Sequence, residues 1–285
     1  MRFWSKQAST RRRGRAPARR FPPPPISPAS VASDCEAGVS TYRDEAIVLR
    51  KLDFKEQDRI YTLLTKEHGK VGAIAKGVRQ PTSRLAGSLE LFGRIDVQLA
   101  RGRSLDIITQ VVRLDLRRIP AEVERTAHAA LVAELADRVS EDRHPLEGVF
   151  NLTAAALAEI AEEEDPRRAT AWFLTVALDL LGYSPRLDVC GSCGRSLPEA
   201  AAAFAPEAGA FLCDSCRTSG LPLTSVPALK VLRLLAAGDV ALYRRLKLEE
   251  RLLTEVDRVL SAQLEHHLDR QLRSLRFLRQ MRLPA

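Results

Sequence analysis

The sequence predicts an α+β protein with two folded parts, a small five-stranded β-barrel followed by an all-α region that carries an inserted four-cysteine metal module. Three observations support this. Five strand-like segments follow one another without a long helix between them, the hydrophobic periodicity becomes helical after Pro120, and two Cys-x-x-Cys pairs interrupt the helical region. With 285 residues, the chain is long enough to build more than one hydrophobic core.

The first 41 residues differ from the rest of the chain. They hold an arginine run (11–13), four consecutive prolines (22–25) and too few apolar residues to offset the entropy lost on ordering. Three interpretations are open: a non-specific nucleic-acid arm, an organelle-targeting segment, or an upstream start codon that adds non-native residues. We favour the last, because the strand-like pattern begins abruptly at Tyr42. Cys35 lies in this segment and is interpreted as an incidental thiol.

Strand character begins at Tyr42 and is typical of residues 45–51, 58–65, 71–78, 95–100 and 105–114. The second and third of these segments flank a turn and predict a β-hairpin, and the fourth alternates between apolar and polar residues. Five strands with no long helix between them favour a small closed barrel. An oligonucleotide-binding (OB) fold has this number of strands, and an SH3-like barrel is the main alternative.

After Pro120 the apolar residues recur with helical spacing, which predicts helices at 121–139, 146–161, 169–181, 226–237 and 254–272. Pro166 suits the first turn of the third helix, and Gly182 favours its end. No run of apolar residues is long enough to predict a membrane span. The expected organisation is an extension at 1–41, a barrel domain at 42–118, and a helical domain at 119–285 with its metal module at 187–219.

The net charge of +8 is unevenly distributed along the chain. Residues 1–41 hold eight Lys or Arg against two acids, residues 42–118 hold sixteen against ten, and residues 119–285 hold twenty against twenty-four. A basic barrel beside an acidic helical region indicates that the barrel is the part that meets a polyanion such as nucleic acid. An ordinary solvated basic surface is the alternative.

Four of the five cysteines form two knuckles, Cys190-x-x-Cys193 and Cys213-x-x-Cys216, with nineteen residues between them. This spacing is typical of a zinc ribbon, in which four thiolates close a tetrahedral site and leave no position for a reactive water. We therefore predict one structural Zn²⁺ per chain and a reducing, cytoplasmic compartment. A ribbon without metal and a redox dithiol are the alternatives, although the βαβ pattern of a thioredoxin-like protein is absent.

The loop after the third strand carries Lys76, Arg79 and Arg84 together with hydroxyl residues and a glycine, a composition suited to a phosphate backbone. Five further cations are predicted to contact DNA from their charge and their place in the barrel, namely Lys51, Lys55, Arg59, Arg101 and Arg103. The barrel has only four aromatic residues, Tyr42, Phe54, Tyr61 and Phe92, and some of these must be core. Binding is therefore expected to be mainly electrostatic and strongly dependent on salt.

The sequence lacks the catalytic motifs of several common enzyme classes. The sequence holds no Gly-x-x-x-x-Gly-Lys-Ser/Thr phosphate loop and no Gly-x-Ser-x-Gly nucleophile elbow. None of its five histidines lies in the His-x-Glu motif that zinc deaminases require. The sequence alone thus favours a binding protein over an enzyme.

The order of these parts resembles that of the bacterial RecO recombination-mediator family. Five segments resemble the barrel of that family: 42–49 (YRDEAIVL), 75–79 (AKGVR), 83–85 (SRL), 89–92 (LELF) and 105–110 (LDIITQ). Two further segments resemble the helical domain of that family. They are 180–185 (LLGYSP), which precedes the first cysteine pair, and 264–275 (LEHHLDRQLRSL). The resemblance covers about residues 42–280 and is nearest to the actinobacterial branch, whereas the extension 1–41 departs from it.

The resemblance implies an OB fold, a helical domain with a zinc module, and a role in DNA repair and recombination rather than an enzymatic turnover. Such proteins bind single- and double-stranded DNA, anneal complementary strands, and act with RecR to help RecA displace the single-strand-binding protein SSB. It implies DNA contacts at Lys76, Arg79 and Arg84, a basic and apolar pocket for the acidic C-terminal tail of SSB, and a place at the bacterial nucleoid. Two alternatives stay open: a zinc-ribbon enzyme that modifies nucleic acid, and a protein scaffold that contacts DNA only indirectly.

Overall fold

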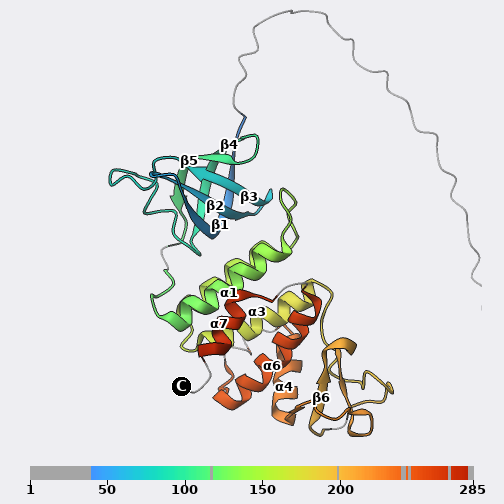
Figure 1. The fold of residues 1–285 in the computed structure, drawn as a ribbon. Helices are drawn as coiled ribbons and strands as arrows, with labels where there is room; N and C mark the ends of the chain where they lie inside the picture. Colours follow the sequence, from blue (N-terminus) through green and yellow to red (C-terminus); the bar gives the residue numbers. More distant parts are fainter. Residues whose placement is uncertain are drawn as a thin grey trace, which may run out of the picture. The chain divides into compact units, whose positions relative to one another are not determined.

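The computed structural model describes residues 40–115, 118–197, 199–238, 242, 245–268 and 271–281 (Figure 1). The predictions made for residues 1–41, including the one for Cys35, concern a segment that lies outside the described residues except for its last two positions, 40 and 41. From Val39 onward the chain forms one compact unit. Its first part is built from strands and its second mainly from helices (Figure 1).

Five strands close into a barrel in the order β1-β2-β3-β5-β4, with β4 paired back onto β1. The strands are β1 (Thr41–Phe54), β2 (Asp58–Thr65), β3 (Gly69–Ala75), β4 (Arg94–Ala100) and β5 (Asp106–Arg113). Strands β3 and β5 pair in parallel and all other neighbours are antiparallel. This is the five-stranded Greek-key barrel of an OB fold, so the predicted fold class is confirmed over the SH3-like alternative.

Strand β1 closes the barrel because it has two partners. Its first half, Thr41–Ile47, pairs with β4, and its second half pairs with β2 as far as Phe54. A bulge between Val48 and Arg50 lies where the strand passes from one partner to the other, and such bulges bend a strand and increase its twist. The strand is therefore longer than predicted at both ends, and its last residues run beyond the barrel core.

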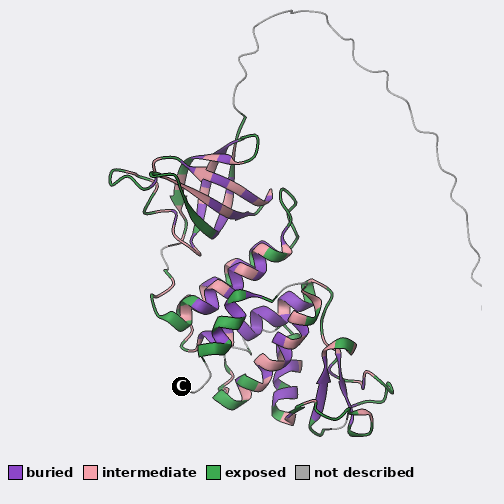
Figure 2. Ribbon diagram, in the orientation of Figure 1, coloured by how far each residue is buried: buried purple, intermediate pink, exposed green. Residues whose placement is uncertain are grey.

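The barrel core follows the period-2 alternation of the sequence, as the alternating burial colours of the strands show (Figure 2). The largest fully buried barrel side chains are Ile47, Tyr61, Leu63, Leu89, Ile95 and Leu99. Strand β3 ends at Ala75 rather than at residue 78 as predicted. Gly77 turns the chain there with a φ of 63°, and its N–H donates to the Asp58 carboxylate at 2.8 Å. The loop after β3 is thus tied to the start of β2.

The second part of the chain has six described helices and a small sheet. The helices are α1 (Val123–Val139), α2 (Val149–Glu162), α3 (Pro166–Leu180), α4 (Val226–Ala236), α6 (Glu250–His267) and α7 (Arg273–Met281). The sheet has the order β7-β6-β8 and is made of β6 (Ala202–Ala205), β7 (Ala210–Leu212) and β8 (Leu223–Thr224), with single 3-10 turns at Pro206–Ala208 and Asp214–Cys216. Four of the five helices predicted from periodicity are present, with ends shifted by a few residues, and the fifth prediction, at 254–272, is considered below.

Both predicted boundary signals of α3 are confirmed. Asp165 caps the helix by accepting the N–H of Arg167 at 2.9 Å, and Pro166 occupies its first turn. At the other end, Gly182 has a φ of 77° and its N–H donates to the Asp179 carbonyl. The next N–H, of Tyr183, reaches back to the Leu178 carbonyl, and this pair of bonds is the Schellman motif that commonly ends a helix.

The prediction of a single helix at 254–272 is wrong. The helix begins earlier, at Glu250, and ends at His267, where Leu268 adopts an extended conformation, and α7 follows as a separate helix. Helix α7 packs against α1, and the Glu134 carboxylate of α1 accepts the N–H groups of Arg273 and Ser274 at 2.9 and 2.8 Å. This carboxylate caps the start of α7 from a different helix. The break between α6 and α7 therefore depends on a contact between distant residues, and the local hydrophobic periodicity does not reveal it.

Barrel and helices meet in a buried junction. Ile47, Leu49 and Leu64 of the barrel belong to the same hydrophobic core as the helices. The α1–α2 loop also pairs with the barrel, since its backbone approaches Gly69 so closely that a Cβ there would lie 2.3 Å from the His144 carbonyl oxygen. A side chain at position 69 is therefore excluded, both by this contact and by a φ of 68°.

The polar centre of the junction is Asp106, which is 0% exposed. Arg143 from the α1–α2 loop donates to its carboxylate at 2.8 Å, the Tyr42 hydroxyl donates to it as well, and the Gly102 N–H donates at 3.0 Å. Burial opposes ionisation of Asp106, but these hydrogen bonds outweigh it and hold its pKa below the ordinary value. Burial, together with the bond to Asp106, raises the pKa of Tyr42 to about 12.

Replacing Asp106 should therefore loosen the junction. We expect Asp106→Asn to lower the free energy of unfolding at pH 7 by about 2 kcal/mol, because hydrogen bonds to a charged group are worth more than neutral ones. Since the pKa of Asp106 is lowered by folding, its contribution is present above the ordinary carboxyl pKa and is lost as the pH falls through the lowered value. Urea denaturation at pH 7 and in mild acid measures both effects.

The matched control is Asp96→Asn, which breaks a bidentate pair with Arg43 on the barrel surface. That pair is solvent-exposed on the arginine side, so its loss should change stability little. Equal denaturation midpoints for the two variants would contradict the role given to Asp106.

Candidate metal centre and nucleic-acid surface

The four predicted cysteine ligands come together in one cluster, outside the helices and around the small β7-β6-β8 sheet. Their sulfur atoms all lie within 4.8 Å of one another, and the Sγ atoms of Cys193 and Cys213 are 3.8 Å apart. Four sulfurs at about 2.3 Å from a tetrahedral ion would be about 3.8 Å apart. The spacing of the sulfur atoms therefore fits a metal ion, and all four residues are free thiols available to hold it.

Each knuckle is a tight turn supported by backbone hydrogen bonds. In the first, the Cys190 N–H donates to the Arg195 carbonyl at 2.8 Å and the Gly194 N–H donates to the Cys190 carbonyl at 3.0 Å. Gly191 lies against β7, where its N–H donates to Phe211 and a Cβ would lie 2.7 Å from that of Ala210. The sheet thus fixes the first knuckle next to the second, which directly follows β7.

Hydrogen bonds favour the thiolate forms of two of the four cysteines, Cys190 and Cys193. A hydrogen bond from Ser192 has the same effect on Cys216, but the neighbouring thiols of Cys213 and Cys193 outweigh it and raise the pKa of Cys216 to about 11. Backbone N–H groups of Cys193 and Cys213 point at the Cys190 sulfur, the latter at 3.4 Å, and lower the pKa of Cys190 to about 6. The Arg195 guanidinium donates to the Cys193 sulfur at 3.4 Å and lowers the pKa of that thiol. Arg195 was not singled out by the sequence analysis. Its place two residues after the second cysteine was the only local signal.

Five cations and three acidic residues lie at the projecting end of the barrel, which we call the barrel tip: residues 51–59 of the β1–β2 hairpin and 76–80 of the loop after β3. Several hydrogen bonds join these segments. The Arg79 N–H donates to the Gln57 carbonyl at 3.0 Å, the Gln80 side-chain amide donates to that of Gln57 at 2.5 Å, and Gly77 is bound to Asp58. The tip brings together five of the eight predicted DNA-contacting cations, which are Lys51, Lys55, Arg59, Lys76 and Arg79.

Two of these cations share a counter-ion. Arg59 donates to the Asp53 carboxylate at 2.6 Å, and a guanidinium nitrogen of Arg79 lies 3.7 Å from the same group. The Arg59 guanidinium holds the pKa of Asp53 below its ordinary range, so the carboxylate is charged at neutral pH. The sequence analysis included Asp53 in none of the predicted sites, although it faces Arg59 directly across the hairpin.

The remaining three predicted DNA contacts lie apart from the tip. Arg84 is exposed, further along the loop after β3. Arg101 and Arg103 belong to the β4–β5 turn, which adjoins the first residue of β1, whereas the tip adjoins the last. Arg101 also lies over the Tyr42 ring, 5.1 Å from its centre. The two groups of cations therefore flank the barrel rather than forming one patch.

The four barrel aromatics, which the sequence could not tell apart, have different environments. Tyr61 is 0% exposed, Tyr42 packs on His68 and bonds to Asp106, and Phe92 packs against the helical core. Phe54 at the barrel tip is 39% exposed. It is thus the one barrel aromatic that the structure presents to solvent.

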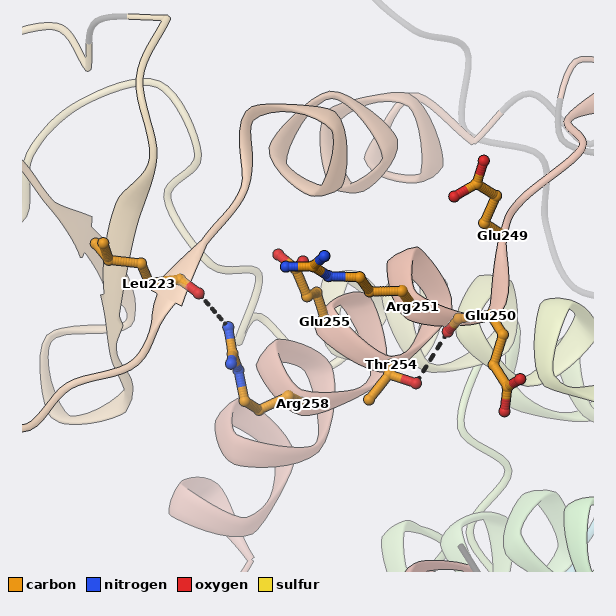
Figure 3. A pocket seen from close by; sticks show the side chains of 7 residues that line it. All are labelled: Leu223, Glu249, Glu250, Arg251, Thr254, Glu255 and Arg258. Carbon is orange, nitrogen blue, oxygen red and sulfur yellow. Dashed lines mark hydrogen bonds between the residues drawn. The ribbon is translucent and has the colours of Figure 1, made fainter.

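A polar hollow of about 800 Å³ lies where β8 meets the start of α6 (Figure 3). Its charged residues have structural partners: Glu255 accepts the Ser225 N–H at 2.7 Å, and Arg258 donates to the Leu223 carbonyl at 2.8 Å. In Figure 3 the carboxylates of Glu249 and Glu250 point away from each other. Glu255 and Arg258 thus hold the start of α4 and the small sheet against α6.

Within the described part of the chain, no helix combines the length and the apolar character needed to cross a membrane.

A closed OB barrel joined to a helical region with a four-cysteine cluster defines a class of two-part proteins that combine this barrel with a candidate metal site. Comparison with known proteins narrows the class. The family model described as "Recombination protein O N terminal" matches residues 39–117, and the model "Recombination protein O C terminal" matches residues 120–276. The chain belongs to the recombination protein O (RecO) family, whose members act in DNA repair and recombination.

The chain is also similar to a DNA repair protein RecO from Nocardioides sp.. The two are 38% identical over 242 residues, a stretch that covers 83% of this chain and 98% of the relative. The resemblance inferred from short motifs in the sequence is thereby confirmed. Membership of the family implies DNA and proteins of the recombination machinery as the general classes of partner of this chain.

Proposed function

We propose that this protein binds single- and double-stranded DNA through its barrel, anneals complementary strands, and helps to load RecA onto DNA covered by SSB. The observation that carries the proposal is the barrel tip, where two segments tied by hydrogen bonds present five cations on an OB fold. Membership of the RecO family supports the same role.

The arrangement of the cations suggests a path for the strand. OB folds bind oligonucleotides on the β2–β3 face, between the loop after β1 and the loop after β4. Here the first of these loops is part of the barrel tip and the second carries Arg101 and Arg103. The face between them has the uncharged side chains of Ile60, Thr62 and Ile74, which offer apolar contact but few hydrogen bonds to bases. Binding on this path would depend on phosphates and not on base sequence.

Annealing follows from the same charges. Two DNA strands repel each other as polyanions, and a basic surface that holds one or both of them lowers that repulsion. The proposal includes RecR and the acidic C-terminal tail of SSB as partners, RecA as an indirect one, and a cytoplasmic, nucleoid-associated location. It assigns no catalytic turnover to the protein, in contrast to a nucleic-acid-modifying enzyme.

We further propose that the four cysteines hold one structural Zn²⁺. The ion would cross-link two knuckles that are far apart in the sequence, and four thiolates would leave no open position for catalysis. The ligands would be Cys190, Cys193, Cys213 and Cys216. The helical domain (119–285), with its module at 187–219, would depend on this cross-link, and the barrel domain (42–118) would not.

Charge reversal tests the DNA surface. We expect Lys76→Glu, Arg79→Glu and Arg84→Glu together to weaken single-strand binding more than tenfold at low salt, because three phosphate contacts are lost. The slope of the logarithm of affinity against the logarithm of salt should become shallower by about 2. Strand annealing should slow in parallel. Fluorescence anisotropy and a strand-annealing assay over a salt series measure these effects.

The control reverses three exposed cations of the helical part, Arg217, Lys230 and Arg276, which changes the net charge equally. If the control weakens binding as much as the loop variant, the effect is one of net charge and not of the barrel. Unchanged DNA affinity in the loop variant would favour the alternative of a scaffold that touches DNA indirectly.

Neutralising Asp53 should have the opposite effect. Asp53→Asn removes a carboxylate that competes with phosphate for Arg59 and Arg79, so we expect DNA affinity to rise about threefold at low salt. Asp96→Asn removes the same charge beside Arg43, near the other end of β1, and should change affinity less. Equal increases in DNA affinity in the two variants would show that Asp53 does not compete with phosphate for Arg59 and Arg79.

Metal analysis tests the zinc proposal. Protein purified without added zinc should contain about one Zn²⁺ per chain, and Cys190→Ser should lose it and lower the melting temperature. Cys35→Ser, which changes the one cysteine outside the cluster, should keep both metal and stability. A full zinc content in Cys190→Ser would contradict the assignment of ligands.

A further inference from the structure

Phe54 occupies an unusual place for an aromatic residue. It is the last residue of β1, in a run of eight consecutive exposed residues (50–57) that projects beyond the barrel core. Its ring is 39% exposed, and the Lys55 ammonium lies 5.5 Å from the ring centre. Leu52, two residues earlier, is 63% exposed. Phe54 belongs to neither hydrophobic core of the described residues, so the exposed part of its ring is available to a ligand.

Two other aromatic residues with similar exposure differ from Phe54 in their setting. Tyr183 is 40% exposed, but its ring stacks on that of His267 at 4.1 Å. Phe277 is 45% exposed and lines a wide hollow between α1, α7 and β1. Phe54 instead lies among the cations of the barrel tip. Its neighbours in β1 and β2, Asp53 and Arg59, form the ion pair that also engages Arg79.

The combination of one free ring and several cations fits one kind of ligand, an unpaired nucleotide. The cations can hold phosphates, and the face of a phenyl ring can stack on any base whatever its sequence. In a duplex the base faces are covered by the neighbouring base pairs, so a ring on the protein surface cannot reach them without unstacking the helix. A surface of this kind therefore distinguishes unpaired from paired DNA.

We propose that Phe54 is a base-stacking contact that gives the barrel its preference for unpaired over paired DNA. The inference rests on the proposed DNA binding and adds to it a residue that recognises bases rather than phosphates. During annealing, pairing would withdraw the stacked base from Phe54 and leave the product held by phosphate contacts alone. The protein would then hold the separate strands more tightly than the duplex that it produces.

The test compares wild type, Phe54→Ala and Phe54→Trp in the full chain, on three probes with equal numbers of phosphates. The probes are an oligothymidylate, the same backbone without bases, and a hairpin duplex. We expect Phe54→Ala to bind the oligothymidylate about tenfold more weakly, and to bind the abasic strand and the duplex as wild type does. The salt slope should stay unchanged, because no cation is removed.

Phe54→Trp should keep the affinity of wild type, and its added fluorescence should be quenched by the oligothymidylate but not by the abasic strand. Subtracting the spectrum of wild type removes the signal of the two native tryptophans. Phe277→Ala is the matched control, since it removes a ring of similar exposure elsewhere and should bind all three probes as wild type does.

Two failures can be told apart. If wild type binds the oligothymidylate and the duplex but Phe54→Ala weakens both equally, or neither, the stacking role is overturned and the proposed DNA binding stands. If wild type binds none of the probes at low salt, the proposed function itself is overturned, and the role of Phe54 with it.

Discussion

The double pairing of β1 is the constraint on which the rest of the barrel depends. A sheet becomes a closed barrel only when its two edge strands pair with each other, and β1 provides this closure by pairing with β4 over Thr41–Ile47 and with β2 from Ala46 to Phe54. The strand continues beyond this double pairing, since residues 50–54 pair with β2 alone and are exposed. This continuation forms the projecting hairpin that carries Lys51, Phe54 and Lys55.

Burial decides what each arginine–aspartate pair does in this protein. At the junction, Asp106 is removed from water and its bonds to Arg143 and Tyr42 tie the barrel to the helices. At the barrel tip, the side chain of Asp53 is 53% exposed, so solvent and salt screen its pairs with Arg59 and Arg79. The same chemical pair is structural in one place and weakened by solvent in the other.

The metal cluster depends on both local and distant contacts. Each Cys-x-x-Cys knuckle forms within a few residues, through the hydrogen bonds of its own turn. The knuckles face each other because Gly191 lies against β7, and Cys213 directly follows that strand. The small sheet thus brings the sulfur atoms within reach of one ion. This explains why the cysteine spacing could be recognised in the sequence, whereas the strands β6–β8, which are two to four residues long, could not.

The sequence by itself determined the elements whose signals are local: five strands with period-2 alternation, most helices with period 3.6, the boundary residues of α3, and the two cysteine pairs. The tertiary structure alone decided which side chains share a surface. It divided α6 from α7 through Glu134, and it gathered five cations at the tip while separating Arg101 and Arg103 from them. It also left Phe54 in solvent while burying Tyr61. The physical reason is the same in each case, since these outcomes depend on contacts between residues far apart in the chain, which no local pattern encodes.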